Sequence, residues 1–216
     1  MTATETIKVL IADDHAIVRE GLRQILTDNK DITVAGDAEN GNDAIKLARK
    51  SDADVLLLDI SMPDRSGIEV LKQVRKDNPR LAVLMLSMHR EDLYAIRSLK
   101  AGAAGYMNKQ SAPAELVDAI RLVAAGKKYI SPALAQELAN HVGDENREVP
   151  PHETLSDREY QTLVMIASGK TVSDIAAELA LSVKTISMYR SRLLQKMKLR
   201  HNAELTHYAI KNHLVE

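Results

Sequence analysis

The chain of 216 residues contains no cysteine, which excludes disulfide bonds, cysteine metal ligands and thiol catalysis. This absence fits a reducing compartment. No uninterrupted apolar run approaches the roughly 18 residues that a membrane span needs. The first ten residues, MTATETIKVL, lack the basic start and the long apolar stretch of a secretion signal. We therefore expect a cytoplasmic protein without a membrane partner.

The net charge is only −1, which by itself predicts no binding partner. The charges are unevenly distributed, however. Up to Thr154 there are 20 basic and 24 acidic residues, a net −4, whereas from Leu155 onward there are 9 and 6, a net +3. A basic C-terminal part is compatible with nucleic-acid binding, although helix surfaces commonly carry surplus lysine and arginine. The length suits two small domains.

The N-terminal part alternates short aliphatic runs with longer amphipathic segments. The runs are Ile7–Ala12, Ile32–Asp37, Val55–Asp59, Leu81–Ser87 and Ala104–Asn108. The segments between them, with apolar spacing near 3.6, are Ala16–Asp28, Gly41–Lys50, Ser66–Asp77, Asp92–Ala101 and Pro113–Ala125. Parallel strands need helical crossovers, so this pattern predicts an α/β domain with a five-stranded, doubly wound parallel sheet and helices on both faces.

The alternation stops after residue 126. The stretch SPALAQELANHV predicts a helix capped by Ser131 with Pro132 at its first position. GDENREVPPHE, rich in charges and turn formers, is typical of a linker. Four helical segments with tight connections follow and predict a small all-α domain. We therefore expect an α/β domain over 1–126, a linker with a helix over 127–153 and a helical domain over 154–216.

Carboxylates stand at the ends of two predicted strands. Asp13 and Asp14 follow the first strand, and Asp59 ends the third. The first and third strands are neighbours in a doubly wound sheet, and ligands bind beyond the carboxyl ends of such strands. Three close carboxylates repel one another without a cation, and hard oxygen ligands suit Mg²⁺. The sequence therefore predicts a Mg²⁺ site at this edge.

Hydrogen-bond donors lie at the ends of two further strands. Ser87 closes the fourth strand and Lys109 follows the fifth. An aspartate can attack phosphorus to form an acyl phosphate, with a metal, a lysine and a hydroxyl holding the phosphoryl oxygens. Each of these five residues alone has an ordinary explanation, such as a helix cap, a solvated strand end or a surface lysine. Together, each at a strand terminus, they indicate a phosphoryl-accepting pocket.

The motifs ADDH, LLLDISMPDRSG, LMLSMH and AGAAGYMNKQ resemble the receiver domain of two-component response regulators of the NarL/FixJ group. The resemblance spans about residues 7–126 and implies the strand order 2-1-3-4-5. It implies phosphorylation of Asp59 by a sensor histidine kinase, with Ser87 and Lys109 holding the phosphoryl oxygens and Tyr106 turning inward as a switch. The implied Mg²⁺ ligands are Asp13, Asp14, Asp59 and the backbone carbonyl of Ser61.

Two residues depart from the common receiver pattern. Gln110 stands where many receivers have a proline after the lysine, so a cis peptide is not expected there. Asn108 places a polar group where many receivers have an apolar one, and the sequence offers no physical reason for it.

The predicted helix Val183–Lys198 has an apolar stripe formed by Ile186, Tyr189, Leu193, Leu194 and Met197. The stripe is expected to be core, so Tyr189 is expected to pack rather than to stack on a base. The opposite face is polar and basic without acidic residues, which suits the major groove of double-stranded DNA. That face comprises Lys184, Thr185, Ser187, Met188, Ser191 and Arg192.

The C-terminal motifs LSDRE, IASGKT, DIAAEL, SVKTIS and LLQKMKL resemble a LuxR-type helix-turn-helix domain, with Val183–Lys198 as the recognition helix. KTISMYRSRLL and AELTHYAI are closer to the BvgA/GacA-like branch. Ser187 and Ser191 stand where several relatives carry lysines, and Tyr189 replaces a common histidine. Fewer cations mean fewer contacts with phosphates or guanines. The operator sequence of other family members is therefore not assumed for this chain.

The sequence thus predicts a transcription regulator in which phosphorylation of Asp59 controls DNA binding by a homodimer. The resemblance implies dimerisation through the last helix, around Glu204–His213, and autoinhibition of the unphosphorylated form is a hypothesis. Two alternatives remain. An enzyme hydrolysing phosphate esters through Asp59 would usually have a second aspartate two residues later, where Ser61 stands. The other is a binding protein whose receiver never carries phosphate.

Overall fold

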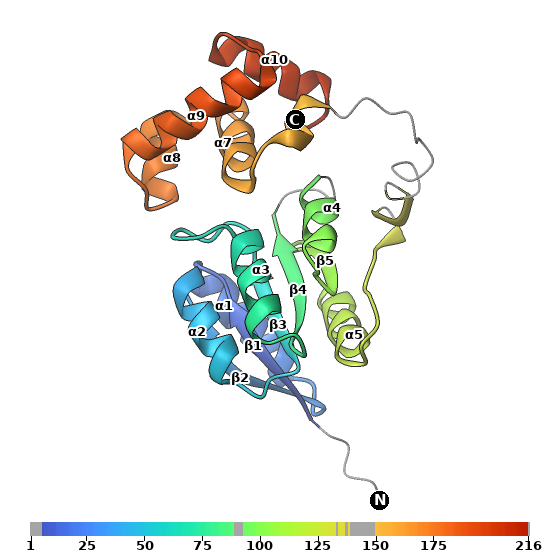
Figure 1. Cartoon of the computed structure of the whole chain (residues 1–216). Helices are drawn as coiled ribbons and strands as arrows, with labels where there is room; N and C mark the ends of the chain where they lie inside the picture. Colours follow the sequence, from blue (N-terminus) through green and yellow to red (C-terminus); the bar gives the residue numbers. More distant parts are fainter. Residues whose placement is uncertain (1–5, 89–92, 133, 137, 139–149, 216) are drawn as a thin grey trace, which may run out of the picture. The chain divides into compact units, whose positions relative to one another are not determined.

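The computed structural model describes residues 6–88, 93–132, 134–136, 138 and 150–215. The chain divides into two compact units, Met1–Gly143 and Asp144–Glu216 (Figure 1). The finer domain boundaries expected from the sequence stay a prediction. None of the helices in the described part of the chain is both long and apolar enough to cross a bilayer.

The first unit contains a five-stranded sheet in the order β2-β1-β3-β4-β5, and every neighbouring pair is parallel. The predicted sheet is confirmed, with strand ends shifted by at most one residue. The fourth and fifth predicted runs begin one residue before their strands, at Leu81 and Ala104, and the second run ends one residue short of Ala38. The strands are β1 (Ile7–Ala12), β2 (Ile32–Ala38), β3 (Val55–Asp59), β4 (Ala82–Ser87) and β5 (Gly105–Asn108).

Four helices connect these strands and a fifth follows β5. The predicted helices are confirmed, although the expected start of the fourth at Asp92 lies outside the described residues. Asn40 and Ser66 cap the second and third helices through their side chains. The helices are α1 (Ala16–Thr27), α2 (Gly41–Lys50), α3 (Gly67–Asp77), α4 (Leu93–Lys100) and α5 (Pro113–Ala124).

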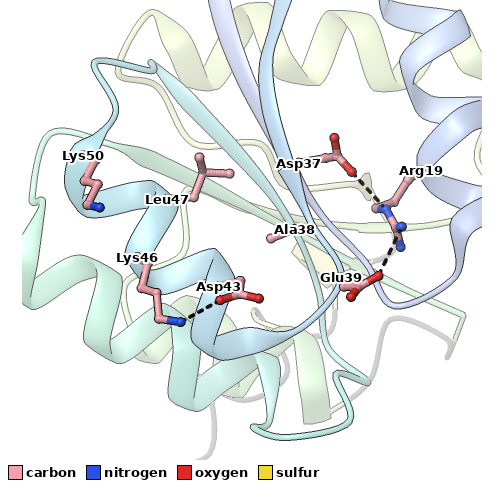
Figure 2. A pocket seen from close by; sticks show the side chains of 8 residues that line it. All are labelled: Arg19, Asp37, Ala38, Glu39, Asp43, Lys46, Leu47 and Lys50. Atoms are coloured by element: carbon pink, nitrogen blue, oxygen red, sulfur yellow. Dashed lines mark hydrogen bonds and ion pairs between the residues drawn. The ribbon is translucent and has the colours of Figure 1, made fainter.

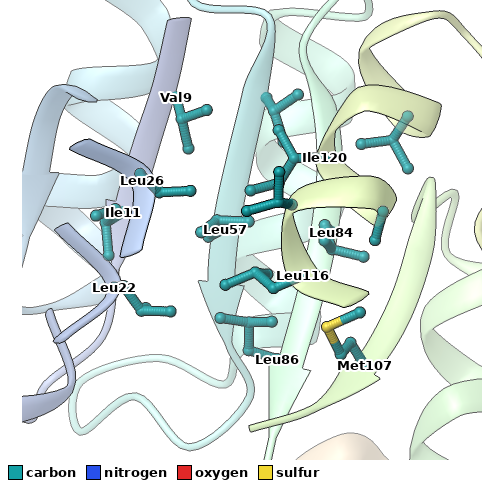
Figure 3. Close-up of a cluster of buried hydrophobic side chains, with 14 of the residues drawn as sticks. Val9, Ile11, Leu22, Leu26, Leu57, Leu84, Leu86, Met107, Leu116 and Ile120 are labelled. Atoms are coloured by element: carbon teal, nitrogen blue, oxygen red, sulfur yellow. The ribbon is translucent and has the colours of Figure 1, made fainter. Parts of the chain in front are cut away.

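The sheet is buried on both faces, which is why β3 can be apolar throughout. Leu57 belongs to the core cluster in which α1 and α5 pack against one face (Figure 3). Leu56 and Leu58 alternate with it and point to the opposite face, where α2, α3 and α4 lie (Figure 1). Burying each such side chain contributes roughly 1.5–3 kcal/mol. The strong hydrophobic pattern therefore fixes the register that carries Asp59 to the edge.

The segment after α5 adds a short pairing to the edge of the sheet. The backbone N–H of Tyr129 donates to the carbonyl of Ala104 at 2.9 Å, and Tyr129 forms a parallel bridge with Gly105. A Cβ on Gly105 would lie 2.8 Å from the Cβ of Tyr129, so glycine is needed for this approach. Residues that were expected to begin a linker thus cover the edge of β5. This pairing is too short to produce a periodic pattern in the sequence.

The predicted start of the linker helix is confirmed. Pro132, Leu134–Gln136 and Leu138 are helical, and the Ser131 hydroxyl accepts from the N–H of Leu134 at 3.1 Å. The remainder of that helix and residues 139–149 of the expected linker lie outside the described residues.

The second unit is helical in its described residues, as predicted. A short 3₁₀ turn, η1 (Pro151–Thr154), precedes the helices. Ser156 and Glu159 form a capping box at the start of the first α-helix, and Thr171 and Asp174 form another at the start of the second. Ala180 takes a left-handed conformation (φ 50°) in the turn after the second helix. The helices are α7 (Asp157–Ala167), α8 (Val172–Glu178), α9 (Val183–Met197) and α10 (Asn202–Lys211).

Candidate functional site

The predicted acidic cluster forms at the carboxyl ends of β1 and β3. These strands are neighbours, with Ala12 paired to Leu58, so the residues that follow them meet. Ligand atoms of Asp13, Asp14, His15 and Asp59 all lie within 4.8 Å of one another. Asp13 and Asp59 are buried, and Asp14 is partly exposed. Packing of apolar strands has therefore forced several negative charges into a small volume.

Lys109 joins the two buried carboxylates. Its Nζ lies 2.6 Å from Oδ2 of Asp13 and 2.9 Å from Oδ2 of Asp59. The lysine side chain is itself only 7% exposed, so water screens these ion pairs little. One ammonium serves both carboxylates. A ligand that brought positive charge to the carboxylates, or negative charge to the lysine, would therefore redistribute the contacts.

Burial raises the pKa of Asp59, and the nearby charge of Asp13 raises it further, against the opposing effect of Lys109. Burial by itself would lower the pKa of Lys109, but the charges and hydrogen bonds of Asp59 and Asp13 outweigh it and leave that pKa raised. The lysine therefore stays protonated. The pocket holds an ionised Asp59 only at an energetic cost, which a cation would reduce.

The backbone fixes both sides of the pocket. The N–H of Lys109 donates to the carbonyl of Ser87 at 2.8 Å, which ties the lysine to the end of β4. The N–H of Ser61 hydrogen-bonds to the Asp59 carboxylate. A Cβ on Gly67 would lie 2.1 Å from the carbonyl oxygen of Asp59, so only glycine lets α3 begin so close to the strand end.

Of the remaining predicted pocket residues, Ser87 lies at the expected strand end and Tyr106 lies within β5. Ser87 is the buried last residue of β4, and Tyr106 on β5 is fully buried. Their functional roles, and the proposed ligand role of the Ser61 carbonyl, stay predictions. No peptide bond within the described residues is cis.

The donor set fits Mg²⁺. Three carboxylates converge, and one ammonium leaves them with excess negative charge. Hard oxygen donors of this kind suit Mg²⁺, which binds one or two carboxylates and keeps several waters. The partly exposed Asp14 leaves one side of the cluster open to such waters.

Sequence reasoning missed two residues of the pocket. His15 donates its backbone N–H to Asp13 Oδ1 at 2.9 Å, and its Nδ1 lies 2.8 Å from Asp14 Oδ1. The signal was its adjacency to the two aspartates. Arg19 in α1 donates from Nη1 to the carbonyl oxygen of Asp13 at 2.8 Å. Its spacing on a helix gave no sign of this contact.

The predicted recognition helix, α9, has the expected two faces. Ile186, Leu193, Leu194 and Met197 are buried, and Tyr189 is partly buried at the edge of the apolar stripe. The Ser182 hydroxyl caps the helix by accepting from the N–H of Thr185 at 3.0 Å. On the opposite face Thr185 is partly exposed and five residues are exposed: Lys184, Ser187, Met188, Ser191 and Arg192.

Other contacts hold α9 in its unit. Lys196 Nζ lies 2.7 Å from Oε2 of Glu159 in α7, and Arg190 Nε donates to Oδ1 of Asn202 in α10 at 2.6 Å. Burial would raise the pKa of Glu159, but hydrogen bonds from Lys196 and from the backbone and side chain of Ser156 leave it lowered. These contacts orient the exposed face of α9.

Two family models match the chain. The response regulator receiver domain matches residues 9–121, and the bacterial regulatory proteins of the luxR family match residues 153–209. The response regulator UvrY of Escherichia coli K12 is 40% identical over 208 residues, covering 96% of this chain and 95% of UvrY. The response regulator GacA of Pseudomonas aeruginosa is 39% identical over 210 residues, covering 97% and 98% of the two chains.

Solved structures agree with these relatives. RcsB from Salmonella enterica serovar Typhimurium, bound to the rprA promoter with the phosphomimetic BeF₃⁻, has a TM-score of 0.64 and 28% identity, covering 94% of this chain and 98% of that one. A LuxR-family response regulator from Aurantimonas has a TM-score of 0.60 and 35% identity, covering 64% and 99%. The chain therefore belongs to the NarL/FixJ family of response regulators, in its GacA-like branch, with a receiver domain followed by a LuxR-type helix-turn-helix domain.

Proposed function

We propose that a sensor histidine kinase phosphorylates Asp59 and that this phosphorylation controls sequence-specific binding of a homodimer to double-stranded DNA. The observation that carries the proposal is the placement of Lys109 between the buried carboxylates of Asp13 and Asp59. Such an ammonium can leave the carboxylates for a phosphoryl oxygen. The protein would act in the cytoplasm, where a DNA-binding regulator meets its target.

In the proposed reaction a carboxylate oxygen of Asp59 attacks the phosphorus of a phosphohistidine. The O–P bond forms as the P–N bond breaks, and the electron pair stays on the imidazole, which takes up a proton. Asp13, Asp14, Asp59 and the backbone carbonyl of Ser61 would hold Mg²⁺. The bound ion would neutralise charge on the phosphoryl oxygens. Lys109 and the Ser87 hydroxyl would hold two of the phosphoryl oxygens.

The phosphoryl group carries roughly two negative charges and replaces the single charge of the Asp59 carboxylate, so the end of β3 becomes more negative by about one charge. Lys109 would follow that charge from Asp13, and Ser87 would move with it. Tyr106 lies on β5, which pairs with β4, so it would respond to a displacement of β4. Such local changes shift a pre-existing equilibrium between receiver conformations. Autoinhibition of the unphosphorylated chain is one form that this control would take.

DNA binding would use the exposed face of α9. Lys184 and Arg192 supply positive charge for phosphates or guanine, and Met188, 39% exposed, offers an apolar contact. Solved relatives include two RcsB dimers bound to two DNAs. In this chain, the second copy would contact α10, where Ile210 is 52% exposed.

We infer that the chain is not a turnover enzyme. Both matched family models describe regulatory modules, and a serine stands two residues after Asp59 where ester hydrolases of this chemistry usually carry an aspartate. Slow self-dephosphorylation of Asp59 is compatible with this proposal. Steady multiple-turnover hydrolysis of small phosphate esters would contradict it.

The experiment is to select DNA sites from a random pool with the full chain and then measure affinity with and without phosphorylation. Acetyl phosphate with Mg²⁺ serves as the phosphoryl donor, and Asp59→Asn is the matched control. We expect phosphorylation to change affinity and dimerisation in the wild type only. Equal DNA affinity in both states would contradict phosphorylation control, and no selected sequence would contradict specific DNA binding.

A further inference from the structure

Arg19 connects the phosphorylation site to a charged network that the proposed reaction does not use. Its Nη1 donates to the carbonyl oxygen of Asp13 at 2.8 Å. The backbone N–H of Asp13 donates in turn to the carbonyl of Ala38 at 3.1 Å. Both main-chain hydrogen-bonding groups of Asp13 are therefore occupied, one by β2 and one by Arg19. The carboxylate of Asp13 is therefore attached to a backbone that is held by hydrogen bonds on both sides.

The guanidinium of Arg19 is itself held in place. Its Nε lies 3.2 Å from Oδ2 of Asp37, and its Nη2 lies 3.9 Å from Oε2 of Glu39 (Figure 2). The Arg19 side chain is 15% exposed, against 38% for Arg23, which binds the other carboxylate oxygen of Asp37 at 2.6 Å. The planar fork of arginine can serve several acceptors at once, which a lysine cannot do. Arg19 is thus the member of this network that reaches the pocket.

The surroundings of the Arg19 guanidinium are open on one side. On the side of α2, Arg19, Asp37 and Glu39 border an open hollow of about 470 Å³ rather than packed side chains. Across the hollow, Lys46 pairs with Asp43 in its own helix (Figure 2). Loss of the Arg19 guanidinium would leave the Asp13 carbonyl to water and release one side of the loop between β1 and α1.

We propose that Arg19 is a positioning residue of the phosphorylation site, fixing the Asp13 backbone so that the Asp13 carboxylate is presented to Mg²⁺ and to Lys109. This inference rests on the proposed function, because it assigns Asp13 a metal-binding role. Residues that orient metal ligands commonly change metal affinity 10- to 100-fold when they are replaced. Arg19 acts through the backbone of a ligand, and we expect an effect of about 10-fold.

The test compares Arg19→Gln with Arg23→Gln in the full chain. Both variants lose an ion pair to Asp37, but only the first loses the bond to the Asp13 carbonyl. Titration calorimetry with Mg²⁺ alone gives the metal affinity. The Mg²⁺ dependence of phosphorylation by acetyl phosphate, followed by intact mass, gives a second readout. Circular dichroism and thermal melting report whether each variant is folded.

We expect Arg19→Gln to weaken Mg²⁺ binding about 10-fold and to raise the half-saturating Mg²⁺ concentration equally, with the rate at saturating Mg²⁺ retained. Arg23→Gln should bind Mg²⁺ like the wild type. Arg19→Lys, which keeps the charge but loses the fork, should lie between them. If Arg19→Gln does not fold, Arg19→Lys against Arg23→Lys makes the same comparison.

Equal Mg²⁺ affinity in the Arg19 and Arg23 variants would overturn the positioning role, whatever their melting temperatures. A wild-type chain that binds no Mg²⁺ and accepts no phosphoryl group would instead overturn the proposed function. A wild type that binds Mg²⁺ but is not phosphorylated would overturn the proposed reaction and would leave calorimetry to decide the role of Arg19.

Discussion

The side-chain oxygen of Asn108 accepts a hydrogen bond from the backbone N–H of Gln110 at 2.8 Å, so the two residues close a turn around Lys109. The carbonyl of Asn108 also accepts from the N–H of Ser111 at 3.0 Å. Proline has no N–H and could not donate this bond. The two departures from the common receiver pattern are therefore linked, because the polar side chain at 108 uses a donor that proline at 110 would remove.

The first prediction concerns this turn. Gln110→Pro removes the donor, and Asn108→Ala removes the acceptor, so each should present Lys109 less accurately to the phosphoryl group. We expect each change to slow phosphorylation by acetyl phosphate about 10-fold or more, because small misplacements of positioned groups have such effects. The measurement is the rate of mass increase at saturating Mg²⁺. Gln110→Ala keeps the N–H and is the matched control. A Gln110→Pro rate equal to that of the control would remove this role from the turn.

The second prediction concerns the stability of the receiver domain. Asp59→Asn removes a buried negative charge, while Lys109 keeps its ion pair with Asp13, whose Oδ2 lies 2.6 Å from the lysine Nζ. Burial raises the pKa of Asp59, so its ionised form destabilises the fold, and the variant should melt at a higher temperature at neutral pH. A gain of about 1 kcal/mol would raise Tm by about 4 °C in a domain of this size.

The pH dependence of that gain follows from the direction of the shift. Below pH 3.8, the ordinary value for the carboxyl, Asp59 is protonated in the folded and the unfolded chain and adds no difference. As pH rises through the higher folded pKa, the wild type loses stability relative to Asp59→Asn. Melting both proteins across this range, without Mg²⁺, measures the difference. A Tm difference that is absent at neutral pH, or that shrinks as pH rises, would show that burial does not dominate.

The third prediction concerns the helical unit. Glu159 caps α7 and binds Lys196, and these hydrogen bonds hold its pKa below 4.5. Its stabilising effect is therefore complete above pH 4.5 and is lost as pH falls through the lower folded value. Glu159→Gln keeps an oxygen that can accept from the N–H of Ser156 but loses the charge that pairs with Lys196, so it should cost up to about 1 kcal/mol at neutral pH and progressively less in acid. Lys196→Met separates the ion pair from the cap. A cost that is independent of pH would argue against the charged contact.

The fourth prediction concerns the exposed face of α9. Arg192→Ala should weaken DNA binding and, if the arginine contacts a phosphate, lower the slope of log affinity against log salt by about 1. If it contacts a guanine, the loss should be about 1–3 kcal/mol and confined to one base position. Affinity at several salt concentrations distinguishes the two cases. Lys76→Ala, which removes an exposed cation on α3 of the first unit, is the control. Equal affinity in both variants would place the interface elsewhere.

The sequence predicted the elements that show hydrophobic periodicity and the residues that lie at strand ends. Alternation of apolar runs and amphipathic segments predicted the sheet, and strand termini placed Asp13, Asp59, Ser87 and Lys109 around one edge. The contacts of Arg19 with Asp13, and of Tyr129 with the edge of β5, could not be predicted in this way. Both depend on how a loop or a helix packs in three dimensions, and neither leaves a repeating pattern in the chain.

Polar side chains that bind the backbone of a segment distant in sequence were also beyond the sequence. Asp64, in the loop after β3, accepts from the backbone N–H groups of Gly41 and Asn42 at the start of α2, 2.7 and 2.9 Å away. Such a carboxylate favours a helix N-terminus. It couples the loop that follows Asp59 to the second helix, and only the folded chain brings these residues together.

The most direct test of the account is the intact mass of the full chain after incubation with acetyl phosphate and Mg²⁺, measured beside Asp59→Asn. We expect the wild type to gain the mass of one phosphoryl group and the variant to gain none. A gain in both proteins would place the acceptor at another residue. No gain in the wild type, under conditions where a known receiver domain is labelled, would contradict the assignment of Asp59 as the phosphoacceptor.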